Sequence, residues 1–164
     1  MMRGLLVILL ALALPSSAIA GASFTFTVNT TSPVTAPGIT LTGDDQTKTF
    51  TMSYTVAYTG GQNTAGWNVQ AASTALTSGT NTLPALEVTG VTSGACTGGA
   101  CVNPTNSITW PVTLSATSTR IFNAAVNTGR GTVVLTATYQ VSYPANALPG
   151  TYSATVTLTG ATGP

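Results

Sequence analysis

The segment from Gly131 to Gly160 alternates apolar and polar residues over two stretches separated by a loop. The apolar positions are Val133, Leu135, Ala137, Tyr139, Val141 and Tyr143 in the first stretch and Tyr152, Ala154, Val156 and Leu158 in the second. A repeat of two residues is typical of a strand with one face in the core and one in water. The segment therefore predicts two strands joined by a loop at residues 144–150. The side chains expected to face the core include Tyr139, Val141, Tyr152, Val156 and Leu158.

Other stretches with the same alternation recur through the rest of the chain. They cover residues 24–28, 39–41, 47–59, 66–71, 86–91 and 108–114. Pro111 marks the last of these as an edge strand or a bulge. Residues 120–129 lack a clear repeat, and we expect a loop with a short helical turn there. With no convincing amphipathic helix, the pattern predicts an all-β fold, a single antiparallel β-sandwich of about eight to ten strands, with a closed barrel as the alternative.

The N-terminus has the pattern of a secretory signal peptide. Arg3 precedes an apolar run from Leu5 to Leu14, and Ala18-Ile19-Ala20 gives a small-x-small cleavage site. The run is shorter than the about 20 residues that a membrane-spanning helix needs, which disfavours a retained anchor. We expect residues 1–20 to be removed and residues 21–164 to form one domain. No later stretch is apolar over a comparable length, so we expect an extracellular protein without membrane contact after cleavage.

The expected mature chain is almost uncharged. Its three basic residues and three acidic residues are Lys48, Arg120, Arg130, Asp44, Asp45 and Glu87. Three scattered cations cannot displace counterions from a nucleic acid, which excludes nucleic-acid binding as a function class. A surface with little charge is compatible with self-association or close packing at a cell surface, because electrostatic repulsion between copies is small. The same composition is equally typical of exported threonine-rich β-proteins.

The residues that carry most enzyme chemistry are scarce. The chain contains no histidine, so the usual catalytic triads, zinc sites and imidazole bases cannot be built. Asp44 and Asp45 are adjacent, which is weak evidence for a calcium site and more typical of a capped turn. We expect no enzyme activity, no cofactor and no metal. Cys96 and Cys101 predict one disulfide in an exported protein, worth about 2 kcal/mol for so short a loop.

Four segments together resemble the WxL (Trp-x-Leu) cell-surface domain family of Gram-positive bacteria. They are Gly66-Trp67-Asn68-Val69, the Cys96–Cys101 region, Phe122 to Gly129, and Pro149-Gly150-Thr151-Tyr152 with the alternating residues up to Leu158. The resemblance covers about residue 50 to the C-terminus. It implies an exported all-β protein held non-covalently to the cell wall through peptidoglycan, with a structural or adhesive role. Trp67 is followed by Val69 and Trp110 by Val112, where the family pattern has leucine, and the C-terminal motif has no tryptophan.

Two functions follow as expectations. The first is a secreted, non-catalytic cell-surface protein that binds peptidoglycan or other surface proteins. Its candidate binding aromatics, if exposed, are Trp67, Trp110, Tyr54 and Tyr58, although burial in the core is the favoured interpretation for each. The alternative is a self-assembling pilin-like or coat-like subunit that exchanges its N-terminal strand, residues 24–28, through the proline-rich hinge at 31–38.

Overall fold

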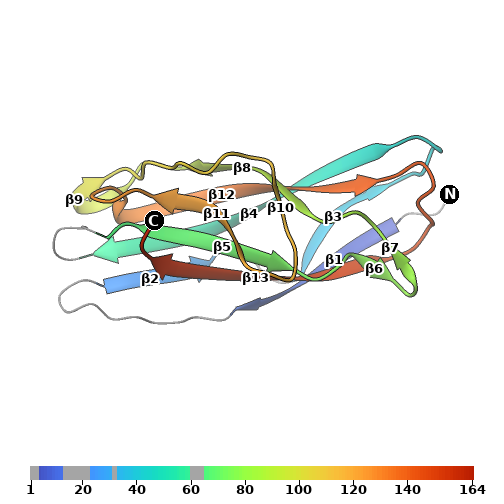
Figure 1. The fold of residues 1–164 in the computed structure, drawn as a ribbon, viewed down its shortest axis with the longest axis horizontal. Helices are drawn as coiled ribbons and strands as arrows, with labels where there is room; N and C mark the ends of the chain where they lie inside the picture. Colours follow the sequence, from blue (N-terminus) through green and yellow to red (C-terminus); the bar gives the residue numbers. More distant parts are fainter. Residues whose placement is uncertain (1–3, 13–22, 31–32, 60–64) are drawn as a thin grey trace.

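The computed structural model describes residues 4–12, 23–30, 33–59 and 65–164, and these contain thirteen strands and no helix. The strands form two sheets packed face to face around one apolar core (Figure 1), so the predicted all-β sandwich is confirmed. All but one of the strand pairings are antiparallel; β1 and β13 are parallel. The number of strands exceeds the expected eight to ten because several are short, three of them only two residues long.

The first sheet, named the β13 sheet, has the order β11-β5-β13-β1-β3, and the β6–β7 hairpin joins it beside β13. Its strands are β1 (Gly4–Leu12), β3 (Val34–Ile39), β5 (Trp67–Ser73), β6 (Thr77–Ser78), β7 (Asn81–Thr82), β11 (Thr119–Ala124) and β13 (Tyr152–Thr162). The second, named the β12 sheet, has the order β10-β8-β12-β4-β2, with β9 paired to β12. Its strands are β2 (Ser23–Val28), β4 (Gln46–Thr59), β8 (Glu87–Ser93), β9 (Thr97–Val102), β10 (Val112–Thr113) and β12 (Arg130–Tyr143).

The longest ladder of the structure joins β12 to β4. It runs without a register shift from the Gly131–Tyr58 pair to the Tyr143–Gln46 pair. Every second side chain of both strands is buried along most of this length, as the period-two pattern predicts. The predicted core residues of the C-terminal segment, Tyr139, Val141, Tyr152, Val156 and Leu158, are all buried.

The two C-terminal strands do not pair with each other, because β12 lies in one sheet and β13 in the other. The connection between them crosses the end of the sandwich. Two hydrogen bonds hold it: the Ala145 amide donates to Asp45 Oδ1 at 2.8 Å, and the Tyr152 hydroxyl donates to the Leu148 carbonyl at 2.8 Å. The segment that dominates the sequence pattern thus supplies a central strand to each sheet.

β1 lies between β13 and β3 and completes the β13 sheet (Figure 1). It runs parallel to β13, from the Leu6–Tyr152 pair to the Leu12–Leu158 pair, and antiparallel to β3. β1 falls within the residues that the sequence predicts to be a cleaved signal peptide, whereas the predicted cleavage site lies outside the described residues. The strand therefore occupies a position in the sheet that processing would empty.

The sequence-based expectation for residues 120–129 was wrong. Residues 119–124 form β11 in place of a helical turn, and only residues 126–127 form a turn. A register shift between Arg120 and Phe122 lets Ile121 and Phe122 both be buried, which breaks the alternation that would have marked a strand. The expected strand at 108–114 is also reduced, to the two residues of β10, and the expected strand at 39–41 lies earlier, as β3.

Candidate functional site

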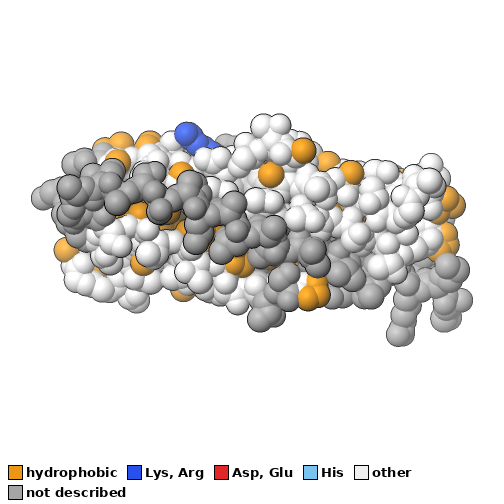
Figure 2. All heavy atoms as spheres, turned by 90° about the horizontal axis from the view of Figure 1, so that it is seen from below, with side chains coloured by type: hydrophobic (Ala, Val, Ile, Leu, Met, Phe, Trp, Pro, Cys, Tyr) orange, Lys and Arg blue, Asp and Glu red, His pale blue; other side chains and the backbone are white. Residues whose placement is uncertain are grey.

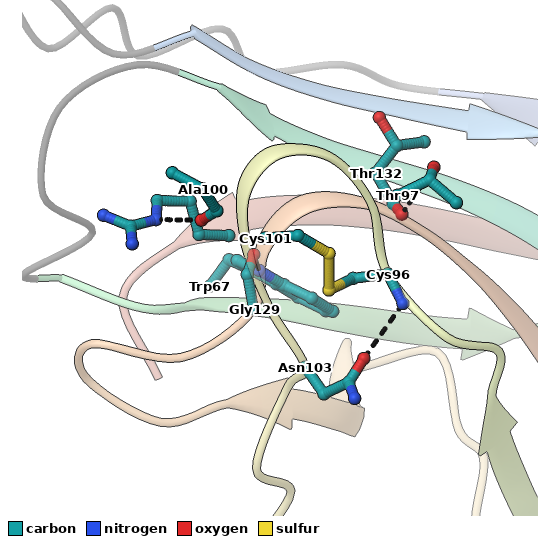
Figure 3. The surroundings of a disulfide bond; sticks show 9 residues. Trp67, Cys96, Thr97, Ala100, Cys101, Asn103, Gly129 and Thr132 are labelled. Carbon is teal, nitrogen blue, oxygen red and sulfur yellow. Dashed lines mark hydrogen bonds between the residues drawn. A yellow bond between two sulfur atoms is a disulfide. The ribbon is translucent and has the colours of Figure 1, made fainter.

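Trp67 is a core residue. Its side chain is fully buried, its indole Nε1 donates to the Gly129 carbonyl at 2.7 Å, and its ring stacks on Phe122 with centroids 5.8 Å apart. Figure 3 shows the indole running beside the loop that contains the disulfide. In this structure the ring offers no face to a sugar or a partner, which corrects its place among the candidate binding aromatics and agrees with the favoured core interpretation.

Tyr54 and Tyr58 are also core residues. Tyr54 is fully buried between the sheets, where its hydroxyl is hydrogen-bonded to the hydroxyl of Tyr139 and its ring lies 5.9 Å from that of Phe26. Tyr58 is buried against the edge of the Phe24 ring. Their candidate role as exposed stacking surfaces is therefore wrong, because β4 directs both toward the opposite sheet.

Trp110 differs from the other three candidates. It is partly exposed, packs against the rim of the core and donates its indole Nε1 to the Ile121 carbonyl at 3.0 Å. The segment around it, residues 103–111, is held by side-chain hydrogen bonds instead of a ladder. Asn106 Oδ1 accepts from the Asn123 amide at 3.0 Å, and Asn123 Oδ1 accepts from the Ser107 amide at 2.8 Å. Trp110 is thus the one predicted aromatic with a partly accessible ring.

The Tyr54–Tyr139 pair leads to a prediction of stability. Replacing Tyr54 alone by phenylalanine leaves the Tyr139 hydroxyl buried without its partner, and we expect the free energy of unfolding to fall by about 1–3 kcal/mol. Replacing both tyrosines removes both polar groups, and the loss should be smaller. Urea unfolding of the two single variants and the double variant measures the difference. A loss for the double variant equal to the sum of the two single losses would show that the two hydroxyls do not depend on each other.

The same pair limits the stability of the folded protein at alkaline pH. Burial raises the pKa of Tyr139 and raises the pKa of Tyr54 well above its usual value, and burial also raises the pKa of Tyr143. In the unfolded chain these groups ionise at about pH 10. The unfolded state therefore loses protons first, so stability is complete below that pH and falls as pH rises above it. We expect the double Tyr54→Phe, Tyr139→Phe variant to show a shallower alkaline loss, read from urea midpoints between about pH 9 and pH 12.

The predicted disulfide joins Cys96 to Cys101, whose Cα atoms are 5.9 Å apart, a usual spacing for such a bond. It closes a loop that contains all of β9 except its last residue, Val102 (Figure 3). Asn103 Oδ1 accepts from the Cys96 amide at 2.9 Å, and Arg130 Nε donates to the Ala100 carbonyl at 2.5 Å. A hollow of about 360 Å³ lies between this loop and the ends of β4 and β12, lined in part by Tyr58 and Arg130.

Asp44 and Asp45 both accept hydrogen bonds at the end of the sandwich where β4 begins. Asp45 accepts from the Ala145 amide, as described above, and Asp44 Oδ2 accepts from the Thr42 hydroxyl at 3.3 Å. Both therefore stabilise turns, in line with the favoured interpretation of this pair. Within the described ranges, no three His, Cys, Asp or Glu side chains gather where they could hold an ion. In that same part of the chain, no helix is long and apolar enough to cross a membrane.

The outer face of the β12 sheet is rich in hydroxyl groups. Ten polar outward residues on β4 and β12 are named the hydroxyl face, and they are Thr47, Thr49, Thr51, Ser53, Thr55, Thr132, Thr136, Thr138, Gln140 and Ser142. Ala57 and the exposed Val134 lie among them, and Thr59 and Arg130 lie at one end of the same face. They face one another across the ladder, with Thr51 opposite Thr138 and Ser53 opposite Thr136. Same-face residues recur about every 7 Å along a strand and strands lie about 5 Å apart, which gives a regular grid of donors and acceptors. The polar half of the alternation could have predicted it.

Charged side chains are also few beyond this grid. In Figure 2, which views the molecule from another side, apolar side chains are scattered among white atoms of the backbone and of other side chains, and basic side chains show only at one edge. Comparison with protein-family models finds no family that matches the chain, and comparison with curated proteins finds no matching relative. The resemblance to the WxL family accordingly stays a prediction from the residues that carry it.

Proposed function

We propose that the chain is a secreted, non-catalytic structural protein of the cell surface that associates with wall peptidoglycan or with neighbouring surface proteins. The hydroxyl face is the observation that carries this proposal. It is uncharged, it extends over the two longest strands of the β12 sheet, and its hydroxyl and amide groups can donate and accept hydrogen bonds. Sugar hydroxyls and peptide amides are complementary to such a grid, and no desolvation of charge opposes their approach.

The fold supports contact through a face better than contact through a pocket. Three of the four candidate aromatics are buried, so stacking on sugar rings cannot be the main source of affinity. β4 and β12 pair over a long ladder without a register shift, which holds the hydroxyl groups at a fixed spacing. A rigid array loses little conformational entropy on binding, which favours many weak polar contacts with an extended polymer.

Sedimentation with purified peptidoglycan tests the proposal. The exported, processed protein is mixed with insoluble peptidoglycan, and the bound fraction is measured over a range of protein concentrations. We expect saturable binding, and we expect the Thr49→Glu, Thr51→Glu variant to bind about tenfold more weakly, because two carboxylates must lose water at the contact.

A matched control carries the same change of charge elsewhere. Thr80→Glu, Thr82→Glu places two carboxylates at exposed positions on or beside the β6–β7 hairpin, in the other sheet, and we expect it to bind like the unaltered protein. Protein that stays wholly in the supernatant would refute wall binding. Equal weakening by both variants would refute the hydroxyl face as the contact surface.

A further inference from the structure

β1 lies between β13 and β3 and pairs with both of them. The place in the sheet that it fills is named the slot. The β13 edge contributes seven paired residues, Tyr152 to Leu158, and the β3 edge pairs antiparallel on the other side. β3 pairs with no strand other than β1 among the described residues. Removal of residues 1–20 would therefore leave the β13 edge unpaired at this position and β3 without a partner strand. Unpaired edges of this length are templates for another strand.

The slot also opens onto the core. Tyr152, Ala154, Val156 and Leu158 of β13 are buried, and Val34 and Ile39 of β3 are buried, in the structure that contains β1. The strand seated there has the sequence Gly-Leu-Leu-Val-Ile-Leu-Leu-Ala-Leu. The slot thus accepts an extended, strongly apolar strand, and its unfilled state would expose apolar surface together with unpaired amides.

Among the described residues, every strand apart from β1 and β3 has a pairing of its own that it would lose by filling the slot of a second copy. Every strand from β4 to β13 is paired with a strand other than β1, and β2 is fixed to β4. The Asn29 amide donates to the Ser53 carbonyl at 2.8 Å and the Ser53 amide donates to Thr30 Oγ1 at 2.7 Å, while Phe26 is buried in its own sheet. Transfer of β2 from its own place to the β1 position of a second copy would break all of these contacts.

The connections between strands do not supply a donor either. Residues 103–111 and 144–151 each contain two prolines, which cannot donate to a ladder. Residues 60–66 read Gly-Gly-Gln-Asn-Thr-Ala-Gly and offer no alternating apolar side chains. Other connections of the expected mature chain are shorter than the seven-residue pairing on β13. The described strands and the connections considered above therefore favour a strand from a different polypeptide as the occupant.

We propose that the processed protein accepts, between β13 and β3, an extended apolar strand from another exported protein, which pairs parallel to β13 in the place of β1. The inference rests on the export and cleavage in the proposed function, and it adds the kind of partner and the place where it binds. Addition of a strand to a sheet gives affinity through main-chain hydrogen bonds and through side chains that enter the core.

The test starts from the full chain, so that folding is not in question. A protease recognition site replaces residues 13–18, the folded protein is cut there in solution, and a fluorescent peptide of residues 4–12 with a lysine tag for solubility is added. We expect the cut N-terminal piece to remain bound during gel filtration and to exchange with the labelled peptide at a stoichiometry of one. A peptide with Ile8→Pro should bind at least about tenfold more weakly, because proline removes a ladder hydrogen bond.

Three outcomes would overturn the proposal. The first is a cut protein that releases the N-terminal piece, stays monomeric and does not bind the labelled peptide. If the amides of residues 152–158 exchange slowly in that protein, β3 has paired with β13 and closed the slot. The second is formation of dimers or polymers after cutting, since a second copy would be the occupant. The third is an intact mass of the secreted protein that still includes residues 4–12. None of these measurements uses peptidoglycan, so failure here and failure of wall binding are separate results.

Discussion

Replacement of Trp67 by alanine is expected to lower the free energy of unfolding by about 4 kcal/mol. The indole is fully buried, stacks on Phe122 and donates to the Gly129 carbonyl, so the change removes a large apolar side chain and leaves a buried acceptor without its donor. For a chain of this size the midpoint of thermal unfolding should fall by about 10 °C. Urea unfolding followed by circular dichroism measures the loss, with Tyr and β-sheet signals reporting the transition.

Trp110→Ala is the matched control, because Trp110 also donates its indole N–H to a backbone carbonyl but is partly exposed. We expect a loss of about 1–2 kcal/mol for it, since less apolar area leaves water when the protein folds. Wall binding by folded Trp67→Ala protein should be unchanged, because the ring faces the core. Equal losses of stability for the two tryptophans, or loss of binding by folded Trp67→Ala, would contradict the assignment of Trp67 to the core.

The sequence predicts the strands that have one face buried in the core and the other face exposed to solvent. β4, β12 and β13 follow this rule over their length, and their predicted core faces are the buried ones. The rule fails at β11, which has a register shift between Arg120 and Phe122 and four consecutive buried residues, Ile121 to Ala124. It also fails for residues 103–111, whose backbone is held by the amides of Asn106 and Asn123, because side-chain hydrogen bonds leave no periodic trace in a sequence.

The candidate site could be predicted only in part. The disulfide follows from two cysteines in an exported chain, and the hydroxyl face follows from the polar half of the alternation. The alternation does not indicate which sheet a strand joins, so it does not predict that β12 and β13 lie in different sheets. The slot is equally hidden, because it is defined by the relation of β1 to two strands that are far from each other in the sequence.

Gly129→Ala is expected to cost about 3 kcal/mol, for two separate reasons. Gly129 has φ of +69°, a conformation that costs an alanine about 1–2 kcal/mol. A Cβ there would also overlap the Trp67 indole and the Ala124 Cβ, and overpacking of a core adds about 1–3 kcal/mol. Gly79→Ala is the matched control, because Gly79 has φ of +59° with open space around its Cβ position. We expect Gly79→Ala to cost about 1–2 kcal/mol, the backbone contribution alone.

The obstacle at Gly129 is removed in part when the indole is removed. In the Trp67→Ala background, Gly129→Ala should therefore cost less than in the unaltered protein, and the difference between the two costs is the coupling between these positions. Urea unfolding of the four proteins in this cycle measures it. Gly129 also contacts the segment that follows the disulfide (Figure 3), because its amide donates to the Asn103 carbonyl at 3.3 Å. The same cost of Gly129→Ala in both backgrounds would show that backbone conformation, and not the indole, requires glycine here.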